Sequence, residues 1–114
     1  MTDLLEDHAG RMWVGIDRTL WVVNDDKVIP VRAKNGTPDI AYIASLAEDA
    51  QHDVWARSAK SLFRIRDEAV VDEYPLGPEL EGRQIIADSQ TGIWLGLRSG
   101  DLAKFRDGKT QTVS

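Results

Sequence analysis

A stretch of nine residues occurs three times in this 114-residue chain and limits the possible folds more than any other feature. The copies span 7–15, 49–57 and 88–96, and in each one an aspartate stands six residues before a tryptophan. The pairs are Asp7 and Trp13, Asp49 and Trp55, and Asp88 and Trp94. Successive tryptophans lie 42 and 39 residues apart, a period typical of a repeated four-stranded sheet rather than a helical hairpin.

The residues of one copy predict a turn that leads into a strand. The aspartate carboxylate can accept hydrogen bonds from backbone N–H groups two residues later, which starts a tight turn. Gly10 and Gly92 permit a positive φ in that turn. An apolar–Trp–apolar run follows, and tryptophan supplies the large area that adjoining sheets bury. We therefore expect the three tryptophans to be equivalent core residues and the repeated aspartates to cap turns.

The repeat continues after the tryptophan. The runs 20–25, 62–67 and 102–107 align without gaps, and each ends in an aspartate. Asp107-Gly108 is a strong hairpin signal, and Asp25-Asp26 and Asp67-Glu68 occupy the matching places. Apolar segments before and after these runs complete four short strands per repeat.

The motifs resemble the two-component regulator propeller repeat. Glu-Asp-x-x-Gly-Arg-Met-Trp-Val-Gly spans 6–15, and Leu-Ala-Glu-Asp-x-x-x-x-Val-Trp spans 46–55. The likeness covers nearly the whole chain, although Arg57 stands where Gly15 and Gly96 stand in the other copies. It implies an all-β fold, a fragment of a β-propeller made of three four-stranded antiparallel blades. We expect one domain over 1–114, with blade 1 at about 1–35, blade 2 at about 36–77 and blade 3 at about 78–114.

The same resemblance suggests a context. Members of the family form extracytoplasmic sensor domains of bacterial signalling receptors, so the resemblance implies a periplasmic or extracytoplasmic location, which the residues themselves do not indicate. We expect residues 1–6 to form a shortened first strand of blade 1, as in an excised piece of a longer receptor or in a solitary remnant.

Composition excludes several classes of function. A net charge of −5 argues against nucleic acid or an anionic membrane surface as the main partner. No apolar run approaches the roughly 18 residues of a spanning helix. The chain has no cysteine, so it forms no disulfide and no thiolate metal site.

No local motif indicates an enzyme. The sequence contains no Gly-x-Ser-x-Gly, His-Glu-x-x-His or phosphate-binding loop. His8 and His52 are the only histidines, and we interpret both as solvated turn residues. We therefore expect no catalytic residue, no cofactor and no metal.

Candidate ligand-binding residues come from the expected loops between the second and third strand of each blade. Arg18, Lys60 and Arg98 place one cation in each of these loops, on the face that the linkers between blades share. Arg57 shares a strand face with Trp55, where it either pairs with a carboxylate or presents a cation near the channel.

The sequence thus predicts a non-catalytic ligand- or partner-binding propeller module. One alternative is a structural or protein-interaction propeller without a small ligand. A less favoured alternative is a propeller enzyme of the streptogramin-lyase kind, which would need a histidine and glutamate cluster that two separated histidines do not suggest. Closed propellers need at least four blades, and a three-blade arc exposes the Trp, Leu and Val set of both end blades. We therefore expect a head-to-tail homodimer that closes a six-bladed propeller.

Overall fold

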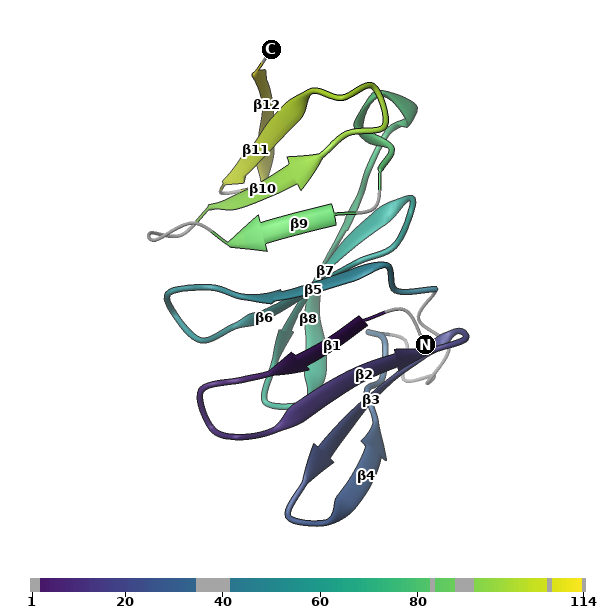
Figure 1. The fold of residues 1–114 in the computed structure, drawn as a ribbon, viewed down its shortest axis with the longest axis vertical. Helices are drawn as coiled ribbons and strands as arrows, with labels where there is room; N and C mark the ends of the chain where they lie inside the picture. The colour runs from purple at the N-terminus through teal and green to yellow at the C-terminus, as the bar shows by residue number, and fades with distance from the viewer. Residues whose placement is uncertain (1–2, 35–41, 83, 88–91, 107, 114) are drawn as a thin grey trace.

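The computed structural model describes residues 3–34, 42–82, 84–87, 92–106 and 108–113, and in these ranges twelve strands form three separate four-stranded sheets (Figure 1). Every strand pairs antiparallel with its neighbours in sequence, so each sheet is a simple meander. The predicted all-β fold of three four-stranded antiparallel blades is confirmed.

Each blade consists of four consecutive strands. Blade 1 contains β1 (Asp3–Glu6), β2 (Met12–Ile16), β3 (Thr19–Asn24) and β4 (Lys27–Pro30). Blade 2 contains β5 (Ser45–Glu48), β6 (Val54–Arg57), β7 (Ser61–Arg66) and β8 (Ala69–Pro75). Blade 3 contains β9 (Gln84–Ala87), β10 (Ile93–Gly96), β11 (Leu102–Arg106) and β12 (Lys109–Val113), and a short 3-10 helix, η1 (Pro78–Leu80), precedes it.

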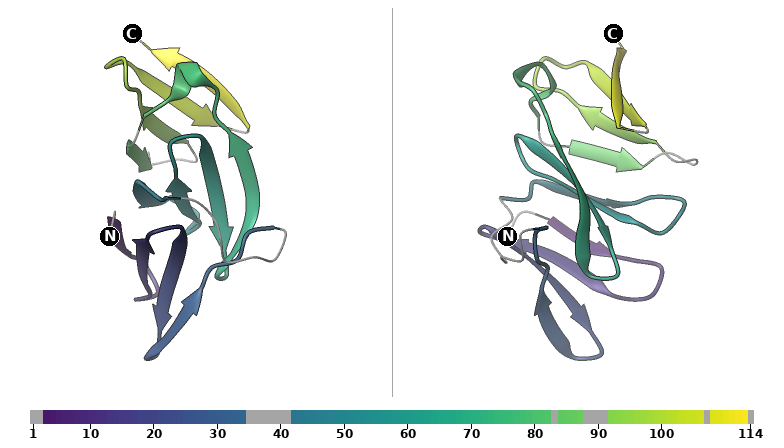
Figure 2. Two further views of the ribbon diagram at one scale, coloured as in Figure 1. Left: turned by 90° about the vertical axis from the view of Figure 1, so that its right-hand side faces the viewer. Right: turned by 180° about the vertical axis from the view of Figure 1, so that it is seen from behind.

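The first strands of the blades lie next to one another and form the inner edge of an arc. β1 contacts β5, and β5 contacts β9. The later strands of each blade spread away from this edge, as the view from the side shows (Figure 2, left). Among the described residues, no helix is long and apolar enough to cross a membrane.

Side-chain rows across each sheet decide which face is buried. Paired residues on neighbouring antiparallel strands point to the same side of the sheet. The row through Trp13 faces blade 2, and Trp13 is 1% exposed. In blade 2, the row through Ala56 faces blade 1, whereas the row through Trp55 faces blade 3. Trp13 and Trp55 therefore point toward the next blade in the chain.

Trp94 is not equivalent to the other two tryptophans, contrary to the sequence prediction. It points to the open side of blade 3, where Lys104 Nζ lies 5.0 Å from its ring centroid and Ile86 is 67% exposed. The open side of blade 1 carries no repeat tryptophan, because Trp13 faces blade 2. Its exposed apolar residues are Leu4, Met12, Ile16 and Val28.

The hairpins between third and fourth strands have the predicted turn chemistry. Asp25 and Asp26 both have positive φ, as do Asp67 and Glu68. Two consecutive positive φ values define the type I′ turn, whose twist matches that of the flanking strands. Gly108 has φ +77°, and Asp107 lies outside the described residues.

Candidate ligand-binding site

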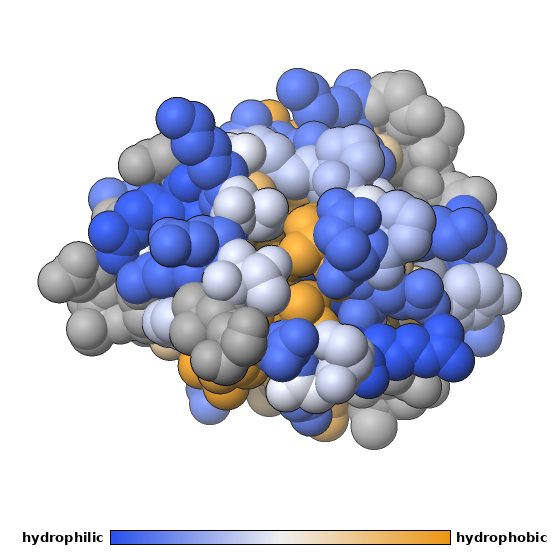
Figure 3. Space-filling view, turned by 90° about the horizontal axis from the view of Figure 1, so that it is seen from above, coloured by the Kyte–Doolittle hydropathy of each residue, from blue (hydrophilic) through white to orange (hydrophobic). Residues whose placement is uncertain are grey.

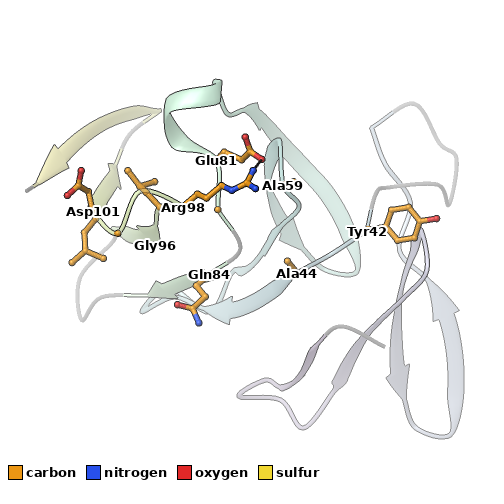
Figure 4. Close-up of a pocket in the computed structure, with 12 residues that line it drawn as sticks. Tyr42, Ala44, Ala59, Glu81, Gln84, Gly96, Arg98 and Asp101 are labelled. Carbon is orange, nitrogen blue, oxygen red and sulfur yellow. Dashed lines mark hydrogen bonds and ion pairs between the residues drawn. The ribbon is translucent and has the colours of Figure 1, made fainter.

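A cavity of about 800 Å³ opens where blade 3 meets blade 2 (Figure 4). Its walls come from the residues before β5, the β6–β7 turn, the segment leading into β9, and the β10–β11 turn. These are the loops and linkers that the sequence places on one face. The lining residues are Tyr42, Ala44, Ala59, Glu81, Gly82, Gln84, Gly96, Leu97, Arg98, Gly100, Asp101 and Leu102.

An ion pair crosses one side of the cavity. Arg98 Nη1 lies 3.0 Å from Glu81 Oε1, and the Arg98 backbone N–H donates to the Glu81 carbonyl at 2.7 Å. Both side chains are largely exposed, so the pair contributes little to stability. It holds the β10–β11 turn beside the segment that enters β9, and it leaves the guanidinium at the cavity edge (Figure 4).

Gly82 allows the backbone to close the cavity floor. A Cβ on Gly82 would lie 2.1 Å from the Gly96 carbonyl oxygen. Only glycine permits this approach of two backbone segments. A Cβ on Gly96 would meet the Gln84 side chain at 3.4 Å. The segment entering β9 therefore depends on Gly82 to reach β10.

Arg57 lies beneath this floor and is completely buried. Its Nη1 donates to the carbonyl oxygens of Gln84 at 3.1 Å and Gly96 at 3.2 Å, and its Nη2 donates to the Leu80 carbonyl. None of the ion pairs found among the described residues involves Arg57, and burial lowers the pKa of its guanidinium. The side chain thus ties blade 2 to three carbonyls of blade 3 and its linker, and it is not among the residues that line the cavity.

The structure brings the loop cations to the cavity unequally. Arg98 lines it, whereas the exposed Lys60 lies outside the lining set although its neighbour Ala59 belongs to it. The guanidinium of Arg18 lies 5.4 Å from the ring centroid of Tyr42, which lines the cavity. Arg18 therefore approaches the site through an aromatic contact that the sequence did not indicate.

The repeated aspartates lie at the opposite ends of the inner strands. Asp7 Oδ1 accepts from the backbone N–H groups of Ala9 and Arg11 at 3.0 and 2.9 Å, and its Oδ2 accepts from Trp13 Nε1 at 2.9 Å. Asp49 makes the same bond to Trp55 Nε1 at 2.8 Å. The hydrogen bond to the indole explains the constant spacing of six residues. The sequence shows the spacing but did not indicate this bond. Asp88 lies outside the described residues.

Burial and hydrogen bonding act in opposite directions on Asp7. Burial alone raises the pKa of its carboxyl group, because the charged form loses hydration. The hydrogen bonds from Trp13 and Arg11, together with the charge of Arg11, more than offset burial and lower the pKa below its usual value. Asp7 is therefore an ionised turn cap rather than a proton donor near neutral pH.

The two histidines are not separated in space, which corrects the interpretation from sequence. His8 in the β1–β2 turn and His52 in the β5–β6 turn stack with their ring centroids 3.9 Å apart. Glu48 lies beside both rings, and one potential ligand atom from each of the three residues falls within 4.8 Å of the others. Both rings are exposed, as expected for turn residues. These turns lie at the far end of β5 from the cavity.

Solved structures with a similar fold are propeller enzymes. A virginiamycin B lyase from Staphylococcus aureus superimposes with a TM-score of 0.78 and 21% sequence identity. A catalytically inactive variant of that lyase with quinupristin gives 0.78 and 13%, and a streptogramin B lyase gives 0.76 and 14%. The matches cover 97% of this chain. The fold is that of a β-propeller fragment.

The similarity has limits of length and sequence. The chain spans only 39–40% of the length of these three lyases. No protein-family model and no curated protein matches the sequence. At identities of 13–21%, the comparison establishes the fold alone.

Proposed function

We propose that this chain is a non-catalytic binding module, of the kind found in propeller sensor domains, and that its ligand occupies the cavity between blades 2 and 3. The cavity itself is the observation that carries the proposal. Its volume falls within the range of about 300–1,000 Å³ that is typical of small-molecule sites. Its position at the loops and linkers is where rigid scaffolds usually place binding residues.

The lining favours a small organic ligand with an apolar body and a polar group. Leu97, Leu102 and the ring of Tyr42 supply apolar surface, and the Arg98–Glu81 pair supplies a cation and an anion at the edge. A ligand carboxylate or hydroxyl could exchange one partner of this exposed pair at low cost, because the pair itself is weak. The buried Arg57 holds the floor in place, and we assign it positioning rather than ligand contact.

Screening a library of small polar organic compounds by ligand-observed NMR tests the proposal. Binders should lose at least about tenfold in affinity, or 1.4 kcal/mol, when Arg98→Ala or Tyr42→Ala removes a cavity wall. Lys60→Ala is the matched control, because it removes a cation from the equivalent turn of blade 2 outside the lining set. Binding that is insensitive to Arg98→Ala and Tyr42→Ala, or a library without any binder, would refute the cavity as the site.

A lyase activity is the second candidate, favoured by the fold of the three solved lyases and by the His8–Glu48–His52 cluster. The separation of that cluster from the cavity disfavours it. The cavity lining holds no histidine, because both histidines of the chain lie in turns at the other end of the sheets. We expect no loss of virginiamycin B, followed by liquid chromatography, when the chain is incubated with it and divalent metal ions.

The partner that best fits the open sides of blades 1 and 3 is a second copy of the chain. Trp94 occupies the place in blade 3 that Trp13 and Trp55 occupy in the buried contacts between blades. On the open side of blade 1, Met12 corresponds to Val54, which is buried against blade 1 in the contact that exists. Joining blade 3 of one copy to blade 1 of another would repeat a contact that the chain already makes twice, and two copies would give six blades.

A further inference from the structure

The cluster of His8, Glu48 and His52 joins neighbouring blades on the face opposite the cavity. His8 follows β1 in blade 1, whereas Glu48 ends β5 and His52 lies in the β5–β6 turn of blade 2. The chain has two histidines and no cysteine, so these two side chains are its only imidazole or thiolate donors for a divalent transition metal. The proposed ligand cavity and the cluster share no residue.

One carboxylate oxygen faces both imidazole rings. His8 Nδ1 lies 2.7 Å from Glu48 Oε2, and His52 Nδ1 lies 3.9 Å from the same oxygen. In a tetrahedral site with metal–nitrogen and metal–oxygen distances of about 2.0–2.1 Å, neighbouring ligand atoms are roughly 3.3–3.4 Å apart. One separation is shorter than that value and the other is longer, and all three potential ligand atoms lie within 4.8 Å of one another, so rotation of the side chains would bring them around one ion.

The Glu48 carboxylate is already oriented toward the rings. The backbone N–H of His8 donates to Oε1 at 3.1 Å and to Oε2 at 3.0 Å. Metal-binding carboxylates commonly have such supporting hydrogen bonds, which fix their orientation. Glu48 also carries little exposed surface, with 18% of its side chain accessible, so it is held by blade 2 while it reaches blade 1.

His52 has a backbone conformation that is unfavourable for most residues other than glycine. Its φ is +69°, and Gly10 at the same place in the first repeat has φ +83°. A residue with a Cβ in this left-handed region costs on the order of 1 kcal/mol relative to glycine. Blade 2 thus has a histidine at a position where the turn favours glycine. This β5–β6 turn lies beside His8.

We propose that His8, Glu48 and His52 form a binding site for a divalent transition-metal ion of the Zn²⁺ class that connects blade 1 to blade 2. Two imidazoles and one carboxylate are donors that Zn²⁺, Ni²⁺ and Cu²⁺ prefer, whereas Mg²⁺ and Ca²⁺ prefer sets made of oxygen atoms alone. Three protein ligands leave the fourth position of a tetrahedral ion to water. The exposure of the rings, 44% for His8 and 57% for His52, gives the ion a direct path from solvent.

Titration of the untagged 114-residue chain with ZnCl₂ in a calorimeter tests the site, with CoCl₂ as a spectroscopic probe. We expect one Zn²⁺ per chain, a visible Co²⁺ absorption band of a four- or five-coordinate ion, and a melting temperature that rises by several degrees with saturating Zn²⁺. MgCl₂ at the same concentration should give no rise in melting temperature.

Three variants distinguish Zn²⁺ binding at the cluster from Zn²⁺ binding to other carboxylates on the surface. His8→Ala, Glu48→Gln and His52→Gly should each weaken Zn²⁺ binding by at least about tenfold, since each removes one of three ligands. His52→Gly is the decisive variant, because glycine suits the positive φ and leaves the metal-free protein folded. Glu79→Gln, which removes an exposed carboxylate from η1, is the matched control and should bind Zn²⁺ like the parent.

Each outcome decides the proposal. Loss of binding in the three variants with retention in Glu79→Gln supports the site. Absence of Zn²⁺ binding by the folded parent protein at millimolar concentration overturns it, and the cluster is then a hydrogen-bonded histidine stack. Equal binding by the parent and by His52→Gly overturns it as well, because the ion would then sit on surface carboxylates.

Discussion

At the scale of single residues, Arg57 fills a position that glycine occupies in the other two repeats. From this position the arginine of blade 2 reaches carbonyl groups of blade 3. A buried guanidinium is stabilised when carbonyl oxygens replace the water that it loses. Arg57 is therefore a fixed link between two blades that no carboxylate neutralises among the described residues.

Arg57→Gly should destabilise the chain by about 2–4 kcal/mol, although it restores the pattern of the repeat. The substitution removes a large buried side chain and leaves up to three carbonyl oxygens without their donor. Denaturant unfolding measures the effect, with Arg57→Lys as a control that keeps the charge but cannot span all three carbonyls. A free energy of unfolding equal to that of the parent would show that the carbonyl contacts contribute nothing.

The sequence predicts the fold but not all of the contacts at the sites, and the distance along the chain between contacting residues explains the difference. The aspartate–tryptophan spacing and the Asp25-Asp26 turn depend on residues close together in the chain, so the sequence alone predicts them. The partners of Arg57 and the meeting of His8 with His52 depend on how blades pack, over 23 to 44 residues of separation. No pattern within a single repeat encodes which turns of neighbouring repeats touch.

At the scale of elements, Asp53 links the second and third strands of blade 2. Its carboxylate accepts from Arg64 Nε at 2.8 Å and from Arg66 Nε and Nη2, both at 3.0 Å. Asp53 is 3% exposed, so it joins the start of β6 to the end of β7 from a buried position. The hydrogen bond from Arg66 and the bonds and charge of Arg64 lower the pKa of Asp53, against the opposing effect of burial.

This pKa shift predicts that the stability of the fold falls in acid. A carboxyl group whose folded pKa lies below its unfolded value of 3.8 stabilises the folded state fully above that pH. The stabilisation is lost as the pH falls from 3.8 to below the pKa of the folded state. Over this range protonation of Asp53 in the folded state weakens its bonds to the arginines. Asp7 contributes in the same direction.

The measurement is the free energy of unfolding from denaturant titrations between pH 5 and pH 2. The parent should lose stability steeply below pH 4, and Asp53→Asn should be less stable at pH 5 but show a shallower decline. Asp101→Asn, an exposed carboxylate in the β10–β11 turn, is the control and should keep the slope of the parent. A parent and an Asp53→Asn variant with the same pH slope would contradict the assignment.

At the scale of the whole molecule, the open face at each end of the arc is the counterpart of a surface that packs against a neighbouring blade within the chain. Seen from the blade 3 end, apolar atoms lie in the middle of the open face between charged and polar groups (Figure 3). Ile86 and Leu102 are 67% and 49% exposed on this side, and Leu4 and Met12 are 50% and 37% exposed on blade 1. Monomers seldom keep contiguous apolar patches at both ends in contact with water.

We therefore expect gel filtration with light scattering to give the mass of two chains at micromolar concentration. Ile86→Glu on blade 3 and Met12→Glu on blade 1 should each convert the dimer to a monomer, because each places a charge in both contacts of a closed ring. Ala69→Glu, at an exposed site on β8 of the middle blade, is the control and should stay dimeric. A folded parent that is monomeric would refute the assembly.

Mixing the two monomeric variants decides how the copies join. In a head-to-tail ring, blade 3 of one copy packs on blade 1 of the other. The Met12→Glu chain keeps an intact blade 3, and the Ile86→Glu chain keeps an intact blade 1, so their mixture can form one unaltered contact and should recover an open dimer of lower affinity than the parent. If instead the same end of each copy met in the contact, one of the two variants would keep its contact surface intact and stay dimeric alone, and mixing would add no further association. Recovery of association on mixing thus distinguishes a propeller closed by two copies from a dimer that joins matching ends.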